Sequence, residues 1–305
     1  MPDSTTKDSG DDTTTQVFAD HRELLFSIVY NLLGSVADTE GVLQDTWLAW
    51  APRNRAQIAN PRAYLVRIAV NAALAQQTTT SRRRETYVGP WLPEPLITEA
   101  TDATDAAEAA VRAEAVSMAL LVVLETLTPL ERAVFVLHEV FGYAHVEIAD
   151  ILDRTPPTIR QLAHRAREHV HARRPRYQAD PRVQQEVTER FLAAALGGDL
   201  DALLQILAPN VTMWTDGGGK AKAAALRPVH GRDKVARMIA GVATRAPKDL
   251  DIRYRTVNGD PSALLFDHDA PFAVMVIDLS PDGDQVAGIY AVTNPDKLTR
   301  IEDEK

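Results

Sequence analysis

Apolar residues recur at helical spacing through the first part of the chain. One predicted helix ends at Gly34 and carries Phe18, Leu25, Ile28, Val29, Leu32 and Leu33. A second helix places Val42, Leu43, Trp47 and Trp50 on one side. A third begins at Asn60-Pro61, because Asn is a good N-cap and Pro is a good first helical residue. No segment of residues 18–77 alternates as a strand does, so this block is predicted to be all helical.

A second helical block covers roughly residues 105–172. Thr128-Pro129-Leu130-Glu131 has the pattern of a capping box and predicts a sharp helix start. Further on, a short helix over 146–152 is followed by the turn Asp153-Arg154-Thr155 and by a longer basic helix from Pro156. This order is typical of a helix-turn-helix, although the turn lacks the Gly that is frequent there.

The pattern changes after about residue 180. Helices are predicted over 183–196, 200–207 and 234–243, and strands over 252–257, 263–266, 272–279 and 286–292. Turn sequences such as Asn258-Gly259-Asp260-Pro261 separate these strands. Helices followed by a meander predict an α+β domain with a curved sheet folded over helices.

Composition narrows the function classes. The 305 residues have a net charge of −9, which excludes a uniformly basic nucleic-acid binder but leaves room for a locally basic one. There is no cysteine, so disulfides, thiol nucleophiles and cysteine-ligated metals are excluded. The longest apolar stretch, 119–124, is far shorter than the ~18 residues of a membrane span. With no signal-peptide pattern at the polar N-terminus, we expect a cytoplasmic protein without membrane contact.

Local basic clusters stand out against this acidic background. If the apolar stripe of the helix from Pro156 packs inward, the outward side chains are Thr158, Arg160, Gln161, His164, Arg165 and Arg167. Arg and Gln reach base edges in the major groove, and further Arg side chains hold phosphates. A solvated basic helix in an ordinary bundle would show the same pattern.

The run Arg82-Arg83-Arg84 follows the third helix, which carries Tyr64, Arg67 and Asn71 at helical spacing. Aromatic and basic groups on one helix suit single-stranded bases, which need stacking and a phosphate track. Tyr64 is equally consistent with a core position, and short charge runs are often only solvated surface.

Three short motifs add a resemblance. They are Tyr87-Val88-Gly89-Pro90-Trp91-Leu92-Pro93-Glu94-Pro95, Asp216-Gly217-Gly218-Gly219-Lys220 and Asn294-Pro295-Asp296-Lys297-Leu298. In this order, behind two helical blocks, they resemble the linker, domain and C-terminal signatures of extracytoplasmic-function sigma factors with a C-terminal SnoaL-like domain. The resemblance covers Phe18 to Leu298. It implies two all-α sigma domains, a region 2 helical bundle and a region 4 helix-turn-helix, plus an α+β domain of SnoaL-like or NTF2-like fold.

The resemblance also implies roles for residues. Region 4 would read the −35 element with Thr158, Arg160, Gln161, His164, Arg165 and Arg167. Region 2 would hold the −10 element open with Tyr64, Arg67, Asn71, Arg82, Arg83 and Arg84. The clamp helices of RNA polymerase core would contact Asp38, Gln44, Asp45, Trp47 and Leu48, and the polymerase flap is a further implied contact. No catalysis, cofactor or metal is implied, because the polymerase performs the chemistry.

Two departures from the family pattern affect these expectations. Gly41 stands where an acidic residue is usual, and it weakens its helix by up to ~1 kcal/mol. Gln76-Gln77-Thr78-Thr79-Thr80 replaces a more charged stretch, which puts the −10 contacts in doubt.

Interdomain or regulatory contacts are expected at the three motifs. Two prolines make the linker stretch Trp91-Leu92-Pro93-Glu94-Pro95 stiff, so Trp91 and Leu92 either staple the linker within the protein or dock elsewhere. Residues 216–220 lack P-loop spacing, and their glycines predict a close backbone approach to another domain. The residues in this expectation are Trp91, Leu92, Pro93, Glu94, Pro95, Asp216, Gly217, Gly218, Gly219, Lys220, Asn294, Pro295, Asp296, Lys297 and Leu298.

The expected organisation is a disordered tail (1–16), region 2 (17–86), a linker (87–107), region 4 (108–176), the SnoaL-like domain (180–298) and a tail (299–305). We expect a promoter-specificity subunit that is regulated in cis by its last domain. The unbound protein is expected to be a monomer. Whether the last domain binds a small ligand is not decided by the sequence. Two alternatives remain. One is a ligand-sensing helix-turn-helix regulator; the other is a cyclase or isomerase with a DNA-binding front end, using Trp214, His230, Tyr254, His268 or Asp269.

Overall fold

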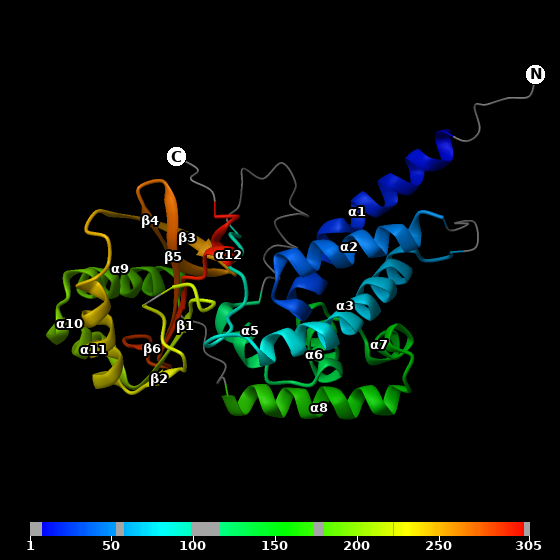
Figure 1. Ribbon diagram of the computed structural model, residues 1–305. Coiled ribbons are helices and arrows are strands. Elements are labelled where there is room, and N and C mark those ends of the chain that lie inside the picture. The colour runs from blue at the N-terminus through cyan, green and yellow to red at the C-terminus, as the bar shows by residue number, and fades with distance from the viewer. Residues whose placement is uncertain (1–7, 53–57, 99–115, 174–179, 222, 302–305) are drawn as a thin grey trace, which may run out of the picture. The chain divides into compact units, whose positions relative to one another are not determined.

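A computed structural model describes residues 8–52, 58–98, 116–173, 180–221 and 223–301. They form two compact units (Figure 1). Of the described residues, the first unit contains 8–52, 58–82 and 124–172, and the second contains 83–98, 116–123, 173, 180–221 and 223–301.

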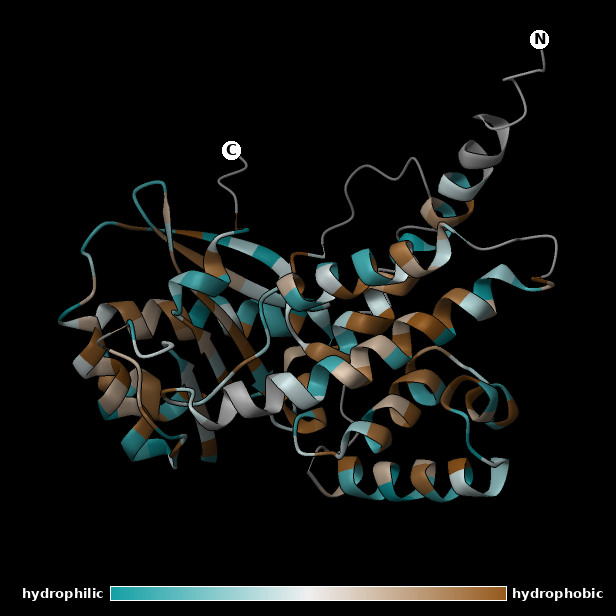
Figure 2. Ribbon diagram, turned by 45° about the vertical axis from the view of Figure 1, so that its right-hand side comes forward, coloured by the Kyte–Doolittle hydropathy of each residue, from teal (hydrophilic) through white to brown (hydrophobic). Residues whose placement is uncertain are grey.

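The described residues of the first unit form helices joined by turns and loops, with no strand among them. Its elements are α1 (Asp8–Leu33), α2 (Val36–Trp50), α3 (Pro61–Glu85), α6 (Pro129–Phe135), the π-helix η2 (Val136–Val140), α7 (His145–Leu152) and α8 (Pro156–Arg173). Apolar and polar residues alternate at helical spacing along α8, as the brown and teal bands of Figure 2 show. The polar face of α8 is the one that the sequence assigns to DNA.

Local signals set several helix starts. Thr128 and Glu131 form the predicted capping box at the start of α6. Asn60 accepts a hydrogen bond from the Ala63 amide at 3.1 Å, which confirms it as the N-cap of α3. The turn between α7 and α8 reverses at Asp153, whose φ of 52° takes the left-handed conformation that Gly usually supplies.

One boundary differs from expectation. The tail expected over 1–16 is wrong for residues 8–16, because α1 begins at Asp8. A tertiary contact supports this first part of the helix: the Trp50 indole Nε1 donates to the backbone oxygen of Thr14 at 3.2 Å. Thr14 and Trp50 are both buried. The polar composition of this segment therefore did not indicate its structure.

The second unit is an α+β domain with a six-stranded sheet. Its elements are α5 (Met118–Leu124, of which residues up to 123 belong here), α9 (Pro181–Gly197), α10 (Leu200–Ile206), β1 (Leu207–Asp216), β2 (Val229–His230), α11 (Arg232–Ala243), β3 (Leu250–Val257), β4 (Asp260–Asp267), β5 (Ala270–Leu279), β6 (Val286–Val292) and α12 (Pro295–Leu298). The strand order is β2-β1-β6-β5-β4-β3. Only β1 and β6 pair in parallel; the other neighbours are antiparallel.

The sheet is therefore mixed, and the predicted meander is incomplete. Strands β3 to β6 were predicted, but β1 and β2 were missed. Pro209 and Asn210 interrupt the β1 sequence, and its pairing with β6 shifts register between Leu207 and Thr212. A bulged strand of this kind lacks the regular alternation that identifies a strand from sequence.

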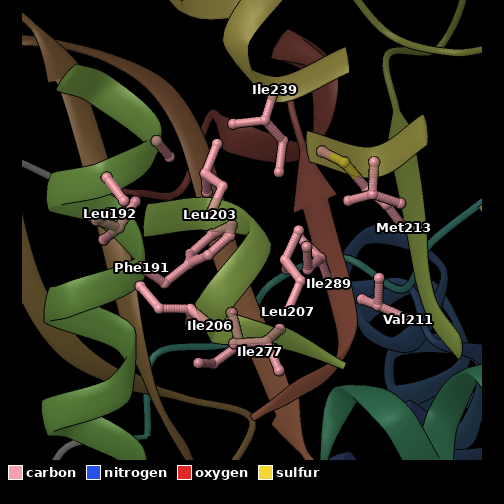
Figure 3. Close-up of a cluster of buried hydrophobic side chains, with 14 of the residues drawn as sticks. Phe191, Leu192, Leu203, Ile206, Leu207, Val211, Met213, Ile239, Ile277 and Ile289 are labelled. Atoms are coloured by element: carbon pink, nitrogen blue, oxygen red, sulfur yellow. The ribbon is translucent and has the colours of Figure 1, made fainter. Parts of the chain in front are cut away.

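Each face of the sheet has its own apolar core. On one face, α9, α10 and α11 pack their buried side chains against the strands (Figure 3). Phe191, Leu203 and Leu207 lie at the centre of this core and are fully buried. Apolar side chains of these helices and of the sheet thus form one of the two cores of this unit.

The opposite face is covered by segments from elsewhere in the chain. Leu92 of the linker, Met118 and Ala119 of α5, Leu298 of α12 and Ile301 join one buried cluster with Phe266 and Val274 of the sheet. The sequence predicted a separate tail over 299–305. That expectation is wrong for Ile301, because this residue is buried in the cluster. The linker and the chain's last described residues are therefore part of the core of this unit.

Candidate functional site

The three sequence motifs meet around Asp216. This residue ends β1 and is fully buried. Its Oδ1 accepts a hydrogen bond from the Tyr87 hydroxyl at 2.5 Å, and its Oδ2 accepts one from the Leu92 amide at 2.8 Å. The Lys297 ammonium lies 2.7 Å from the same Oδ2. One carboxylate thus joins the linker to the C-terminal motif.

The charges in this cluster compensate each other. Burying a carboxylate is unfavourable unless it is paired and hydrogen-bonded. Both oxygens of Asp216 are engaged, and Lys297, with 11% of its side chain exposed, also donates to the backbone oxygen of Leu92. Burial and the hydrogen bond to Asp216 raise the pKa of Tyr87, so its hydroxyl remains a donor to a higher pH than that of an ordinary tyrosine.

Two glycines of the Asp216 loop allow a close approach to the linker and to Asn294, which belong to the same unit, whereas the sequence predicted an approach to another domain. Gly218 has φ of 57°, and a Cβ there would lie 2.4 Å from Nδ2 of Asn294. That Nδ2 donates to the Tyr87 hydroxyl at 2.8 Å. At Gly219, with φ of 73°, a Cβ would lie 3.1 Å from the side chain of Val88. Larger residues at these positions would displace Asn294 or the linker.

The rest of the linker follows the edge of the sheet. The Leu96 amide donates to Oδ1 of Asn258 at 3.2 Å, and the Asn258 amide donates to the Leu96 oxygen at 2.8 Å. Ile97 pairs with Val257 beside β3. Pro93 and Pro95, which have no backbone N–H to satisfy, are buried. Residues 92–98 are therefore bound along the domain by main-chain hydrogen bonds.

The other motif residues lie outside the contacts around Asp216. Lys220 and Asp296 form an ion pair at 2.6 Å with exposed side chains. Glu94 is buried in the linker, and Pro295 begins α12 after its N-cap Asn294. A Cβ on Gly217 would lie 2.5 Å from the Cβ of Ala224, so this glycine permits folding of the loop itself.

In the first unit, α8 presents most of the expected DNA-reading residues to solvent. Thr158, Arg160, Gln161, His164 and Arg165 are exposed. The opposite face, with Ile159, Ala163, Ala166 and Val170, is buried. Arg167 differs, because it is half-buried and its guanidinium lies 2.6 Å from Glu139. Its charge is thus partly engaged within the protein.

The −10 residues of α3 are not all exposed for DNA. Tyr64 is half-buried with its ring centroid 6.0 Å from that of Trp50, whereas Arg67 is exposed. Asn71 is also exposed, but its side-chain amide donates to the backbone oxygens of Arg67 at 2.7 Å and of Ile151 in α7 at 2.9 Å. Helix α3 includes positions 82–84, but the side chains of Arg82, Arg83 and Arg84 lie outside the described residues.

The expected polymerase-binding residues divide into two groups on α2. Gln44, Asp45 and Leu48 are exposed, and Leu48 has 62% of its surface accessible although it is apolar. Trp47 is half-buried and contacts the Phe18 ring edge-on. Asp38 is half-buried and accepts a hydrogen bond from Gln76 at 3.2 Å.

The unusual Gln76-Gln77 pair stabilises the helical bundle. Gln77 is buried, and its amide donates to the backbone oxygen of Leu32 at 2.6 Å. Together with the Gln76 bond to Asp38, this contact ties α3 to α1 and α2. Gln76 and Gln77, the first two residues of the stretch that differs from the family pattern, are therefore engaged within the protein.

Sequence reasoning missed two structural contributors. Tyr87 is the first residue of the linker motif, but the sequence did not indicate a contact for it. Its hydrogen bonds with Asp216 and Asn294 show that it helps to bind the linker. Arg132 is almost fully buried, donates to the Asn31 backbone oxygen at 3.0 Å and pairs with Glu125. A lone Arg before the apolar run 133–137 was the available signal.

The side chains considered for an enzyme do not gather. Trp214 stacks on Tyr290, whereas Tyr254 packs against the core that α9, α10 and α11 form with the sheet. His230, His268 and Asp269 are exposed. Within the described ranges, no group of three or more His, Asp or Glu could hold a metal ion. No helix in those ranges is long and apolar enough to cross a membrane.

Comparison with known proteins identifies each part. Residues 17–83 match the family model of sigma-70 region 2, residues 117–170 that of sigma-70 region 4, and residues 188–293 that of the SnoaL-like domain. The chain is 38% identical over 288 residues to the ECF RNA polymerase sigma factor SigJ of Mycobacterium tuberculosis, covering 91% of each chain. It is 28% identical over 289 residues to the probable ECF sigma factor SigI of that organism, covering 94% of this chain and 95% of SigI.

The fold agrees with these sequence matches. The crystal structure of Mycobacterium tuberculosis SigJ superposes with a TM-score of 0.74 at 36% identity, covering 93% of this chain and 98% of SigJ. The chain therefore belongs to the extracytoplasmic-function sigma factors of RNA polymerase. It is an alternative sigma factor that directs the polymerase to promoters, and it carries a fused SnoaL-like domain.

Proposed function

We propose that the SnoaL-like domain regulates this sigma factor in cis by binding the linker between regions 2 and 4. The buried contact of Asp216 with Tyr87, the Leu92 amide and Lys297 is the observation that carries the proposal. A bound linker has fewer conformations open to it than an unbound one. The domain thereby controls how the two DNA-binding modules cooperate, because cooperation between linked modules depends on linker length and stiffness.

The exposed face of α8 reads the −35 element in this proposal. Arg160 and Gln161 make base contacts, while Thr158, His164 and Arg165 contact bases or phosphates nearby. Exposure of all five side chains supports this assignment. Arg167 contributes less unless its pair with Glu139 opens.

Region 2 carries the polymerase contact and the −10 contact. An exposed Leu48 beside Gln44 and Asp45 has the apolar and polar character of a protein-binding surface. Trp47 and Asp38, which have partners within the bundle, hold this face of α2 in place. Arg67 contacts −10 DNA together with Arg82, Arg83 and Arg84. Tyr64 stabilises helix α3 within the bundle.

The Asn71 contact supports a resting state in which regions 2 and 4 are together. Elements at −35 and −10 are about 25 base pairs apart, or roughly 85 Å of duplex. Asn71 of the −10 helix cannot keep its hydrogen bond to Ile151 of the helix-turn-helix while both elements are bound. Promoter binding on the polymerase therefore requires separation of these two helices.

The same proposal gives the SnoaL-like domain a binding role rather than an enzymatic one. Apolar side chains of α9, α10 and α11 pack against the sheet. Among the described residues, the candidate acid and base groups point to no common centre. The domain acts by binding, and the polymerase supplies the chemistry.

Transcription in vitro with purified core polymerase tests the regulatory role. The proteins compared are the full chain, a chain ending at Pro295, a chain ending before Asp180, and Asp216→Asn. On a pool of promoter fragments, the full chain should give specific transcripts, and the two truncations should change their yield differently. Asp216→Asn should shift the yield in the direction of the chain ending at Pro295. Equal output from all four proteins would overturn regulation in cis.

A further inference from the structure

The Lys297 ammonium lies in a cage of aromatic rings. Its Nζ is 4.1 Å from the ring centroid of Trp91 and 5.3 Å from that of Tyr87. Asp216 Oδ2 and the Leu92 backbone oxygen complete the surroundings as acceptors. Two aromatic faces with a carboxylate are the groups that recognise ammonium ions in proteins, through cation–π attraction and charge pairing.

The cage and its occupant come from different parts of the chain. Tyr87, Trp91 and Leu92 belong to the linker, and Asp216 belongs to the end of β1. Lys297 lies on α12, a single turn of helix that follows β6. The groups that form this site all lie outside α12. Lys297 therefore occupies the site as an internal ligand.

We propose that Tyr87, Trp91 and Asp216 form an ammonium-binding site that Lys297 occupies in cis, and that a small primary alkylammonium ion binds there when Lys297 is absent or withdrawn. This inference rests on the proposed function, because occupancy of the site is what holds the linker. The acceptors define the class of ligand. A primary ammonium donates to both Asp216 and the Leu92 oxygen, whereas a quaternary ammonium has no N–H to donate.

The energetics favour an occupied site. Asp216 is fully buried, so removal of its cation leaves an uncompensated charge. The vacated site then either takes another cation or releases the linker. A side chain held in cis has an effective concentration of about millimolar or more, so an external amine must be in the millimolar range or above to compete.

Chemical rescue tests the site directly. Lys297→Ala removes three methylenes and the ammonium, and propylammonium supplies the same atoms. Hydrogen exchange of residues 86–98 in the full-length chain reports whether the linker is bound. We expect Lys297→Ala to raise the linker exchange rate at least about tenfold, and millimolar propylammonium to reverse most of that increase. Should this variant not fold, Lys297→Ser leaves similar space and is tested in the same way.

Two controls separate specific binding from salt effects. Tetramethylammonium at equal ionic strength should leave the exchange of Lys297→Ala unchanged. The double variant Lys297→Ala, Asp216→Asn should not respond to propylammonium. Unchanged linker exchange in Lys297→Ala, absence of rescue, or equal rescue by both cations would each overturn the ammonium site.

The outcomes also distinguish this inference from the regulatory proposal. If rescue fails while Asp216→Asn still alters transcription, regulation stands and the ammonium site is rejected. If rescue succeeds while Asp216→Asn leaves transcription unchanged, the site binds ammonium and regulation through the linker is rejected.

Discussion

Asp216 and Lys297 are 81 positions apart in the chain, and their charged atoms are 2.7 Å apart in a buried pair. Asp216 is fully buried and also accepts hydrogen bonds from two linker groups, Tyr87 and the Leu92 amide. Loss of either charge would leave the other without compensation in a largely buried position. The pair therefore couples the C-terminal motif to the linker.

Asp216→Asn should destabilise the second unit by about 3–5 kcal/mol, because it leaves Lys297 buried without its counter-charge. Denaturant unfolding followed by tryptophan fluorescence measures this change. Asp296→Asn is the matched control, since it removes an acid from the same motif region in an exposed pair with Lys220. The control should cost no more than about 1 kcal/mol. Equal costs for the two variants would contradict the central role of Asp216.

Gly218→Ala should cost more stability than Gly198→Ala. Both glycines have positive φ, 57° and 66°, so both variants carry the strain of about 1–2 kcal/mol for a left-handed residue. Only the Cβ at position 218 meets another residue, 2.4 Å from Asn294 Nδ2, whereas the space at Gly198 is open. Gly218→Ala should therefore also increase hydrogen exchange in the linker. Similar melting temperatures and linker exchange in both variants would argue against a close approach.

Arg160→Ala should weaken promoter binding by the holoenzyme by about 1–3 kcal/mol and relax specificity within the −35 element. Arg167→Ala should have a smaller effect, because Arg167 is engaged by Glu139 at 2.6 Å. Glu139→Gln should increase the contribution of Arg167 to DNA affinity. Binding to promoter fragments with single −35 substitutions measures each effect. A larger loss from Arg167→Ala than from Arg160→Ala would reverse this assignment.

The phenol of Tyr87 should ionise at higher pH than an ordinary tyrosine. Burial, and then the hydrogen bond to Asp216, raises its pKa above 10.0, the value of an ordinary tyrosine. Because the folded pKa is the higher one, the stabilising contribution of this phenol is complete below pH 10.0 and is lost as the pH rises through the folded pKa. Linker binding should therefore persist to about pH 10 and weaken above it.

Spectrophotometric titration of tyrosinate checks this expectation. The curve of the wild-type chain minus that of Tyr87→Phe isolates one phenol. Its midpoint should lie above 10.0, the value for an unperturbed tyrosine. A difference curve centred at or below that value would show that Tyr87 does not donate to Asp216 in solution.

Local sequence signals predicted much of the secondary structure. The capping box at Thr128, the N-cap at Asn60 and the apolar periodicity of α8 act through residues within one or two turns, so they can be recognised without a fold. Strands β3 to β6 were found for the same reason, by alternation and turn residues. Strand β1 was missed, because its bulge and its parallel pairing with β6 depend on a distant strand.

The sequence by itself determined the family, the helix-turn-helix and the three motifs as candidate contacts. Only the tertiary structure decided which atoms of those motifs meet: Tyr87 and Lys297 converge on Asp216 from 129 and 81 positions away. It also turned Asn71 toward Ile151 and Arg167 toward Glu139. The physical reason is that caps and periodicity arise from neighbours in the chain, whereas a buried charge is stabilised by whichever partners the fold brings within hydrogen-bond distance.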